Sequence, residues 1–201
     1  MQRRSRVTVE DILIAAAHVF DDLGYASGTT NRIAAKAGVS IGTLYQYFSS
    51  KEAIAIALLE RHVHDAMQRL RQWVSHCLTE QLSLDAAIAW LVHGILELHL
   101  EQPRLQRMLL EETPRTGGVQ EAWHAAEREA ARIIAGLLRC YPEVRHPTLE
   151  RAAWMTVQTV QALTHHFAAD PEHAMPRDAF EAELVALVRA YLVHGAPGCQ
   201  A

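Results

Sequence analysis

The chain is poor in the features that mark secreted, membrane-spanning and disulfide-stapled proteins. Its 201 residues hold only three cysteines, Cys77, Cys140 and Cys199, too widely spaced for a disulfide framework or a zinc knuckle. No run of eighteen uncharged apolar residues occurs, and the best candidate, residues 86–100, is short and contains Glu97 and two histidines. The basic N-terminus lacks the apolar stretch of a signal peptide. We therefore expect a cytoplasmic protein with no membrane span.

Signatures of catalysis and of cofactor binding are missing too. There is no G-x-S-x-G, phosphate loop or dinucleotide fingerprint, so we predict neither an enzyme nor a bound cofactor. Histidine is abundant, with twelve in the chain. Only His93 and Glu97 have the i, i+4 spacing that puts two metal ligands on one helix face, and no third ligand is evident. We predict no metal site, although a metal-sensing protein stays an alternative.

Residues 29–51, TTNRIAAKAGVSIGTLYQYFSSK, predict two short helices joined by a tight turn. Thr29 or Thr30 can cap the first helix, and Gly38 suits the left-handed conformation of a sharp exit. Ser40 can cap the second helix, whose buried side is marked by Leu44 and Phe48. Such an arrangement can place one helix in a DNA major groove.

Two helices this short need a third element to lean on, and residues 8–20 supply it. Thr8 and Asp11 form a variant capping box. Gly24 is the expected C-terminal cap. The preceding MQRRSR either reaches DNA phosphates or a minor groove, or is a disordered, solvated terminus. The apolar stripe of this helix consists of Ile12, Leu13, Ala16, Val19 and Phe20.

Residues 8–60 resemble the DNA-binding domain of the tetracycline-repressor (TetR) family of bacterial transcription regulators. The matching pieces are FDDLGY, TTNRIAAKAGVS, GTLYQYF and SSKEAI, with their spacing intact. The resemblance implies a helix-turn-helix whose second helix, the recognition helix, reads DNA. It implies that Ile41, Gly42 and Thr43 approach base edges, and the planar amide of Gln46 can pair with adenine. The positions that it implies for phosphates, or for phosphate or base in the case of Asn31, are Thr30, Asn31, Tyr45, Tyr47 and Lys51.

Charge divides the chain in the same way. Residues 1–51 hold six basic and four acidic side chains, a net charge of +2, whereas the whole chain carries −4, which leaves −6 for residues 52–201. A basic end on an acidic body suits a protein that docks on DNA through one end. We therefore expect a helix-turn-helix domain in residues 1–50 and a second domain in residues 51–201, which the resemblance implies to be a ligand-binding and dimerisation domain.

The larger part predicts a helical bundle and no sheet, so the expected fold class is all-α. Helices are expected over residues 51–79, 83–101, 103–112, 119–141, 148–169 and 177–194, with a loop at residues 113–118. The last two helices carry apolar stripes, and the resemblance implies that they pair with a second copy to form a homodimer. The alternative is that both stripes face only the core of their own chain. The candidate interface residues are Ala152, Met155, Val160, Leu163, Phe167, Leu184, Leu187, Val188 and Tyr191.

The middle helices carry bulky apolar side chains with a few polar groups, which favours a pocket for an apolar or aromatic effector. The expected function is a dimeric repressor that a small molecule releases from a palindromic operator; the release is implied by the resemblance. Activation instead of repression, and a ligand-independent regulator that acts through a protein partner, stay open. The candidate pocket residues are Trp90, His93, Glu97, Met108, Trp123, Trp154 and Gln158.

Overall fold

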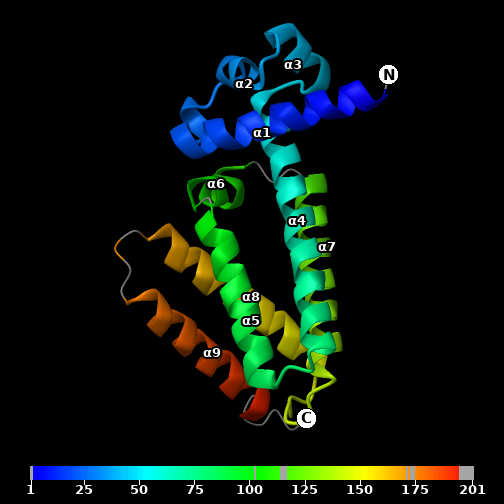
Figure 1. Cartoon of the computed structure of the whole chain (residues 1–201), viewed down its shortest axis with the longest axis vertical. Helices are drawn as coiled ribbons and strands as arrows, with labels where there is room; N and C mark the ends of the chain where they lie inside the picture. The colour runs from blue at the N-terminus through cyan, green and yellow to red at the C-terminus, as the bar shows by residue number, and fades with distance from the viewer. Residues whose placement is uncertain (1, 102, 114–116, 171, 173–174, 195–201) are drawn as a thin grey trace. The chain divides into compact units, whose positions relative to one another are not determined.

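The computed structural model describes residues 2–101, 103–113, 117–170, 172 and 175–194. Within these residues the chain forms nine α-helices and one π-helical turn, with no strand, which confirms the predicted all-α class (Figure 1). The elements are α1 (Gln2–Ser27), α2 (Thr30–Ala37), α3 (Ile41–Tyr47), α4 (Lys51–Thr79), α5 (Leu84–Glu101), α6 (Pro103–Arg107), η1 (Met108–Glu112), α7 (Gly117–Leu138), α8 (Leu149–Ala169) and α9 (Arg177–His194).

The chain divides into two compact units. The N-terminal unit comprises Met1–His64 and Gln102–Glu121, and the C-terminal unit comprises Asp65–Glu101 and Ala122–Ala201. The predicted domain boundary lies after residue 50. In the structure the first half of α4 groups with the N-terminal unit, and its Lys51 and Arg61 bond to α1. The segments α6 and η1 belong to the same unit because they pack on α1.

Helix α1 starts earlier than the capping box predicted. It begins at Gln2, so Thr8 lies inside the helix, and the basic arm continues the helix backbone. The side chains of residues 1–7, including the three arginines of the arm, lie outside the described part of the structure. No Pro or Gly interrupts residues 2–8, and arginine and glutamine favour a helix, so nothing stops it at Thr8.

The end of α1 and the core of the N-terminal unit agree with the prediction. Gly24 has φ of 72°, the left-handed region, and breaks the regular helix there. A Cβ on Gly28 would lie 2.5 Å from the Phe20 ring, so only glycine lets the chain pass this close. The predicted apolar stripe of α1 is buried at all five positions.

Helices α2 and α3 have the predicted caps. Thr29 accepts a hydrogen bond from the Arg32 amide at 3.4 Å, and Ser40 accepts one from the Thr43 amide at 3.0 Å. Gly38 ends α2 with φ of 69°. These caps fix the tight turn between the two helices.

The segment α6–η1 packs against α1 within the N-terminal unit. The backbone amide of Leu105 donates a hydrogen bond to the Asp21 carboxylate of α1 at 3.0 Å, which satisfies a free amide at the start of α6. Leu105, Met108 and Leu109 are buried. The segment that covers α1 therefore lies in the sequence between α5 and α7, most of whose residues belong to the C-terminal unit.

The core of the C-terminal unit joins the second half of α4 to α5, α7, α8 and α9. Its buried residues include Leu70 of α4, Val92 of α5 and Ile134 of α7, together with Val160 of α8 and Leu192 of α9. The predicted bounds of α4 and α9 are confirmed, and α5 and α8 begin one residue later than predicted, after the caps Ser83 and Thr148. Helix α7 spans 117–138 instead of 119–141, and residues 114–116 of the expected loop lie outside the described residues. No described helix is long and apolar enough to span a membrane.

Candidate DNA-binding surface

Helix α3 presents an uncharged outer face. Leu44 is completely buried and Phe48 is 9% exposed, so these two anchor the helix in the unit, as predicted. The outer face carries Ile41, 38% exposed, together with Tyr45 and Tyr47. Because α3 has no acidic or basic side chain, contact with DNA from this helix would use hydroxyls, amides and apolar groups.

The beginning of α3 is open to a close approach. Gly42 is exposed, and a Cβ built on it would meet only the Ser40 hydroxyl, at 3.8 Å. The Thr43 hydroxyl is within 2.8 Å of the Ser40 hydroxyl, and Gln46 is exposed one turn further on. The predicted base-reading residues Ile41, Gly42, Thr43 and Gln46 thus lie on one short helix with free surface.

A tyrosine joins α3 to the start of α2. The hydroxyls of Tyr45 and Thr30 are 3.2 Å apart, although fifteen residues separate them in the chain. Tyr45 is 51% exposed, so its ring stands at the surface with its hydroxyl beside the N-terminus of α2. Hydroxyls and free amides at a helix N-terminus are suited to a phosphate oxygen.

Lys51 has a structural role that the sequence did not reveal. Its ammonium group donates to the backbone carbonyl of Tyr25 at 2.7 Å and lies 4.2 Å from the centre of the Tyr25 ring. It therefore satisfies a carbonyl where α1 ends and joins α4 to α1. A phosphate contact by Lys51 stays a prediction, and it would have to coexist with this bond or replace it.

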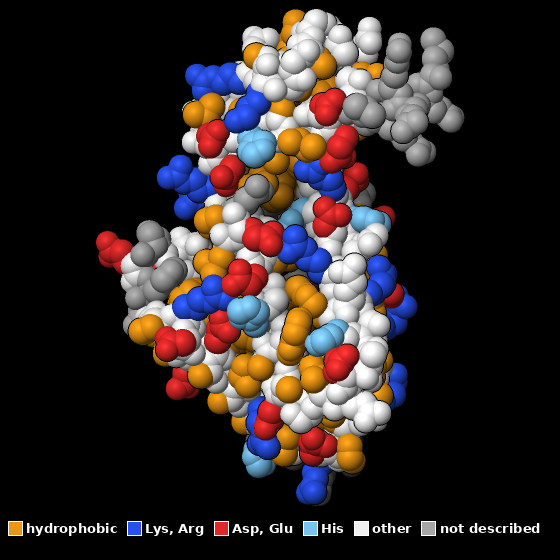
Figure 2. Space-filling view, in the orientation of Figure 1, with side chains coloured by type: hydrophobic (Ala, Val, Ile, Leu, Met, Phe, Trp, Pro, Cys, Tyr) orange, Lys and Arg blue, Asp and Glu red, His pale blue; other side chains and the backbone are white. Residues whose placement is uncertain are grey.

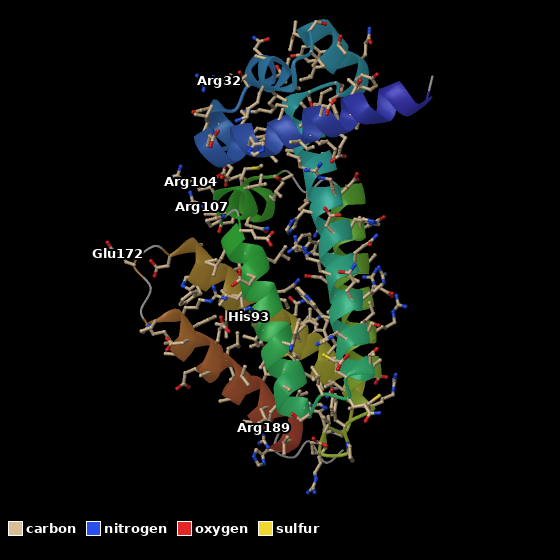
Figure 3. The ribbon with its side chains drawn as sticks, viewed as in Figure 1. Arg32, His93, Arg104, Arg107, Glu172 and Arg189 are labelled. Carbon is tan, nitrogen blue, oxygen red and sulfur yellow. The ribbon has the colours of Figure 1, made fainter. Side chains whose placement is uncertain are left out.

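Exposed basic side chains of the N-terminal unit lie beyond the predicted set. Arg32 follows the exposed Asn31 in the first turn of α2, and Figure 3 shows it pointing outward, as do Arg104 and Arg107 of α6. Arg32 is one of the six basic residues among residues 1–51. The signal that could have nominated it is its place beside Thr30 and Asn31 at a helix N-terminus, where an arginine can add a phosphate contact.

The seven candidate pocket residues fall into separate sets of contacts. Trp90 is 44% exposed and its ring lies 4.5 Å from that of His76. Met108 is buried in the N-terminal unit, and Trp154 is 45% exposed. Trp123 donates a hydrogen bond to Glu127, which lies outside the predicted set, whereas the amide nitrogen of Gln158 is buried without a hydrogen-bond partner among the described residues. The described contacts do not join all seven residues, and a pocket that they form together stays a prediction.

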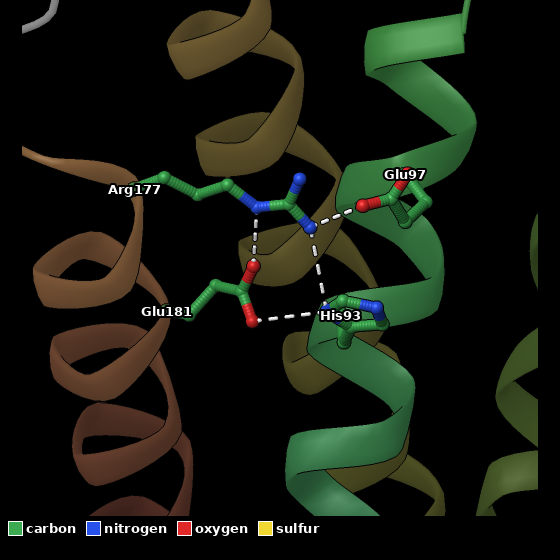
Figure 4. Close-up of polar contacts among 4 residues, drawn as sticks. All are labelled: His93, Glu97, Arg177 and Glu181. Atoms are coloured by element: carbon green, nitrogen blue, oxygen red, sulfur yellow. Dashed lines mark hydrogen bonds and ion pairs between the residues drawn. The ribbon is translucent and has the colours of Figure 1, made fainter.

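His93 and Glu97 belong to a charged cluster that links α5 to α9 (Figure 4). Arg177 donates to Glu181 at 2.7 Å and also bonds to Glu97, while His93 lies 3.1 Å from Glu181. Figure 2 shows acidic, basic and histidine side chains gathered at the surface where Figure 3 labels His93. Both ligands of the metal alternative are thus engaged with Arg177 and Glu181, and the described residues contain no cluster of three or more metal-ligating side chains.

The candidate interface residues of α8 and α9 lie on both sides of their helices. Five of them are buried inside the C-terminal unit and have no surface to offer a second copy; these are Ala152, Val160, Phe167, Leu184 and Val188. Tyr191 is partly buried, with its hydroxyl 3.2 Å from His146. The exposed members are Met155 and Leu163, each 39% exposed, and Leu187, 52% exposed. An apolar stripe indicates that a face is covered, and here the chain's own core covers most of it.

Two family models match the chain. One, described as "Tetracyclin repressor-like, C-terminal domain", matches residues 83–192, which is more than half of the sequence. The other, described as "Bacterial regulatory proteins, tetR family", matches residues 12–58 and so covers the helix-turn-helix.

Some known proteins match part of the sequence, and others match the fold over most of the chain. The transcriptional activator FasR of Mycolicibacterium smegmatis is 42% identical over 77 residues, which is 38% of this chain and 35% of FasR. The match therefore spans about a third of that relative's length. The structure of FadR from Bacillus subtilis in complex with stearoyl-CoA matches 93% of this chain and 98% of FadR, with a TM-score of 0.69 and 21% identity. SmeT, the repressor of the Stenotrophomonas maltophilia multidrug efflux pump SmeDEF, matches 94% of each chain at 27% identity and a TM-score of 0.66.

Proposed function

Because the chain belongs to the TetR family of bacterial transcriptional regulators, we propose that it is a dimeric repressor that binds a palindromic operator and is released from it by a small molecule. The observation that carries the DNA-binding part is the pairing of the Tyr45 and Thr30 hydroxyls beside the exposed face of α3. Two hydroxyls that can bind a phosphate would then lie beside the helix face that we propose contacts bases.

One group of side chains contacts bases and a second group contacts phosphates. Ile41, Gly42, Thr43 and Gln46 contact bases, because they occupy the outer face of a helix short and bare enough to enter a major groove. Thr30, Asn31, Tyr45, Tyr47 and Lys51 hold phosphates and fix the position of α3. The net charge of +2 on residues 1–51 is modest, so tight binding depends on two copies acting together.

The second copy binds to the exposed face of α8 and α9. Met155 and Leu163 on α8 and Leu187 on α9 supply apolar surface that the C-terminal unit does not cover. A two-fold pairing through these helices would hold two α3 helices at a fixed spacing, as a palindromic site requires. Velocity sedimentation at micromolar concentration tests this step, and a monomer there would contradict the proposal.

Release requires that the effector bind better to a conformation in which the two α3 helices no longer match the operator. The complex of FadR with stearoyl-CoA supports a small-molecule effector in a protein of this fold. FasR is named an activator, so the sign of regulation depends on where the operator lies relative to the promoter. A regulator that acts through a protein partner is the alternative, but the comparisons do not favour it.

Selection of bound sequences from random duplex DNA, at salt near physiological, tests the proposal. We expect an enriched palindrome with two half-sites. With that operator and a scrambled duplex, Tyr47→Phe should weaken both complexes alike, since phosphates are common to all sequences. Gln46→Ala should weaken the operator complex by about 1–3 kcal/mol per half-site and spare the scrambled one. Equal losses on both duplexes with Gln46→Ala would contradict the role assigned to Gln46. If a folded protein, unfolded and refolded beforehand to remove any bound ligand, enriches no sequence, the proposal is wrong.

A further inference from the structure

The chain has only two lysines, Lys36 and Lys51, and the structure holds them differently. Lys36 forms an ion pair with the Asp22 carboxylate at 3.5 Å. The ammonium group of Lys51 donates to the backbone carbonyl of Tyr25 at 2.7 Å and to that of Ala26 at 3.4 Å. It also lies 4.2 Å from the centre of the Tyr25 ring. Two carbonyls and an aromatic face, all of them uncharged, therefore hold Lys51.

Uncharged partners hold the ammonium group of Lys51 but do not neutralise it. Among the described side chains, no aspartate or glutamate forms an ion pair with Lys51. An ammonium group has three N–H donors, and the two carbonyls use two of them. The bond to Ala26 is exposed, so the ammonium group lies at the surface. A phosphate oxygen can therefore bind Lys51 without displacing the bond to Tyr25.

Tyr25 is itself fixed by its neighbours. Its ring lies 5.7 Å from the ring of Phe20, which is completely buried. Gly24, with φ of 72°, interrupts the regular helix directly before Tyr25. Burial, and after it the charge of Glu52, raises the pKa of the Tyr25 hydroxyl, so the residue is a neutral phenol at pH 7. The ring and the carbonyl of one well-packed residue thus both contact Lys51.

Lys51 is the first residue of α4, so its ammonium group lies near free backbone amides. Ser50 precedes it and accepts a hydrogen bond from the Ala53 amide at 3.1 Å. The positive end of the helix dipole and the ammonium group both favour a phosphate. A free lysine side chain must be ordered when it binds, which costs conformational entropy. Because Tyr25 already holds Lys51, much of that cost falls on folding instead of on DNA binding.

From these contacts we infer that Tyr25 is a positioning residue for DNA binding, which acts through Lys51: it holds the ammonium group where a phosphate of the DNA backbone meets it. The inference rests on the proposed function and adds to it a residue that does not itself contact the DNA. The ring attracts the ammonium group through its π face. The carbonyl belongs to the backbone and stays in any variant, so a substitution at Tyr25 tests the ring alone.

A double-mutant cycle on operator binding tests the inference, with the operator obtained by selection and fluorescence anisotropy at one fixed salt concentration. Tyr25→Leu removes the ring and should raise the Kd of the dimer about 5- to 30-fold, because each copy loses one cation–π contact. Tyr25→Phe keeps the ring and changes no charge, so its Kd should stay within about twofold of the wild type. In a Lys51→Met background, Tyr25→Leu should have no further effect, since the ring then has no ammonium group to hold.

The salt dependence of operator binding is a readout that altered packing alone would not change. Lys51→Met removes one phosphate contact per copy, so the slope of log K against log salt concentration should fall in magnitude by about 1.8 for the dimer. This measurement tests the inference even if Tyr25→Leu does not fold. Lys36→Met is the matched control, because it removes the same charge from a lysine that pairs with Asp22, and it should leave the slope almost unchanged.

Equal losses from Tyr25→Leu in the wild-type and Lys51→Met backgrounds would mean that the ring only packs, and would overturn the inference. So would an unchanged Kd in a folded Tyr25→Leu protein, an equally large loss with Tyr25→Phe, or an unchanged salt slope with Lys51→Met. Any of these results, obtained while the wild type binds its operator, refutes this inference alone. A wild-type protein that enriches no DNA sequence would contradict the proposed function, and this inference with it.

Discussion

The hydroxyl pair of Thr30 and Tyr45 allows the proposed DNA contact to be tested with little disturbance of the fold. Tyr45→Phe and Thr30→Val each remove one hydroxyl and leave the shape of the side chain almost unchanged. The Tyr45 ring is 51% exposed and its bond to Thr30 lies at the surface, so each variant should lose less than about 0.5 kcal/mol of unfolding free energy.

The loss of DNA affinity should be larger than the loss of stability. A hydroxyl that binds a phosphate contributes about 0.5–1.5 kcal/mol, and a dimer uses each hydroxyl twice, which gives about 1–3 kcal/mol or roughly a 5- to 150-fold rise in Kd. Because the two oxygens are 3.2 Å apart, they are expected to hold the same phosphate. The double variant should then deviate from additivity by about 0.5 kcal/mol or more.

Fluorescence anisotropy with a labelled operator, at one fixed salt concentration, measures these effects. Tyr141→Phe, in the C-terminal unit, removes a tyrosine hydroxyl elsewhere and should leave the Kd unchanged. The reasoning fails if both single variants bind the operator as tightly as the wild type. It also fails if their affinity falls only as much as Tyr141→Phe lowers it, or if the two losses simply add.

Two further predictions concern the C-terminal unit. Gly94→Ala would put a Cβ 2.6 Å from the Trp73 ring and should cost about 1–3 kcal/mol in urea unfolding, whereas Gly136→Ala, with no atom within 4 Å, should be neutral or stabilising; equal effects would contradict the packing argument. Burial opposes the ionisation of Glu181, but hydrogen bonds from Arg177 and His93 prevail and lower the pKa of its carboxyl. The stability that this adds is present above the unfolded carboxyl pKa of about 4.3 and is lost as pH falls through the folded value. Arg177→Gln should therefore reduce stability by up to about 1 kcal/mol at pH 7 and by less at pH about 3, and a loss independent of pH would refute the assignment.

Local signals in the sequence predicted the helices well. Ser40 and Gly38 fixed the turn between α2 and α3, because capping side chains and a left-handed glycine act on their own few residues. The predicted start of α1 was wrong because Thr8 and Asp11 resemble a helix cap, while the residues before them also adopt the helix. A capping pattern identifies the start of a helix only where the residues before it disfavour a helix.

Non-local packing was harder to predict. The stripes on α8 and α9 show that Val160 and Leu184 are covered, but not whether by the same chain or by a second one. Glu127, which accepts the bond from Trp123, was missed because a glutamate on a helix usually faces solvent. Its register with Ile134 and Leu138 was present in the sequence, and the structure was needed to show that this side of α7 points inward.

The way in which α6 and η1 group with α1 has a consequence for protein engineering. If residues 1–50 alone were replaced by those of another regulator, the new α1 would rest on the α6 and η1 of this chain, and the backbone amide of Leu105 would lose the carboxylate of Asp21. A transplant that respects the compact units must carry two separate stretches, residues 1–64 and 102–121, into the recipient. Circuits built by swapping operator specificity between such regulators therefore need a discontinuous graft.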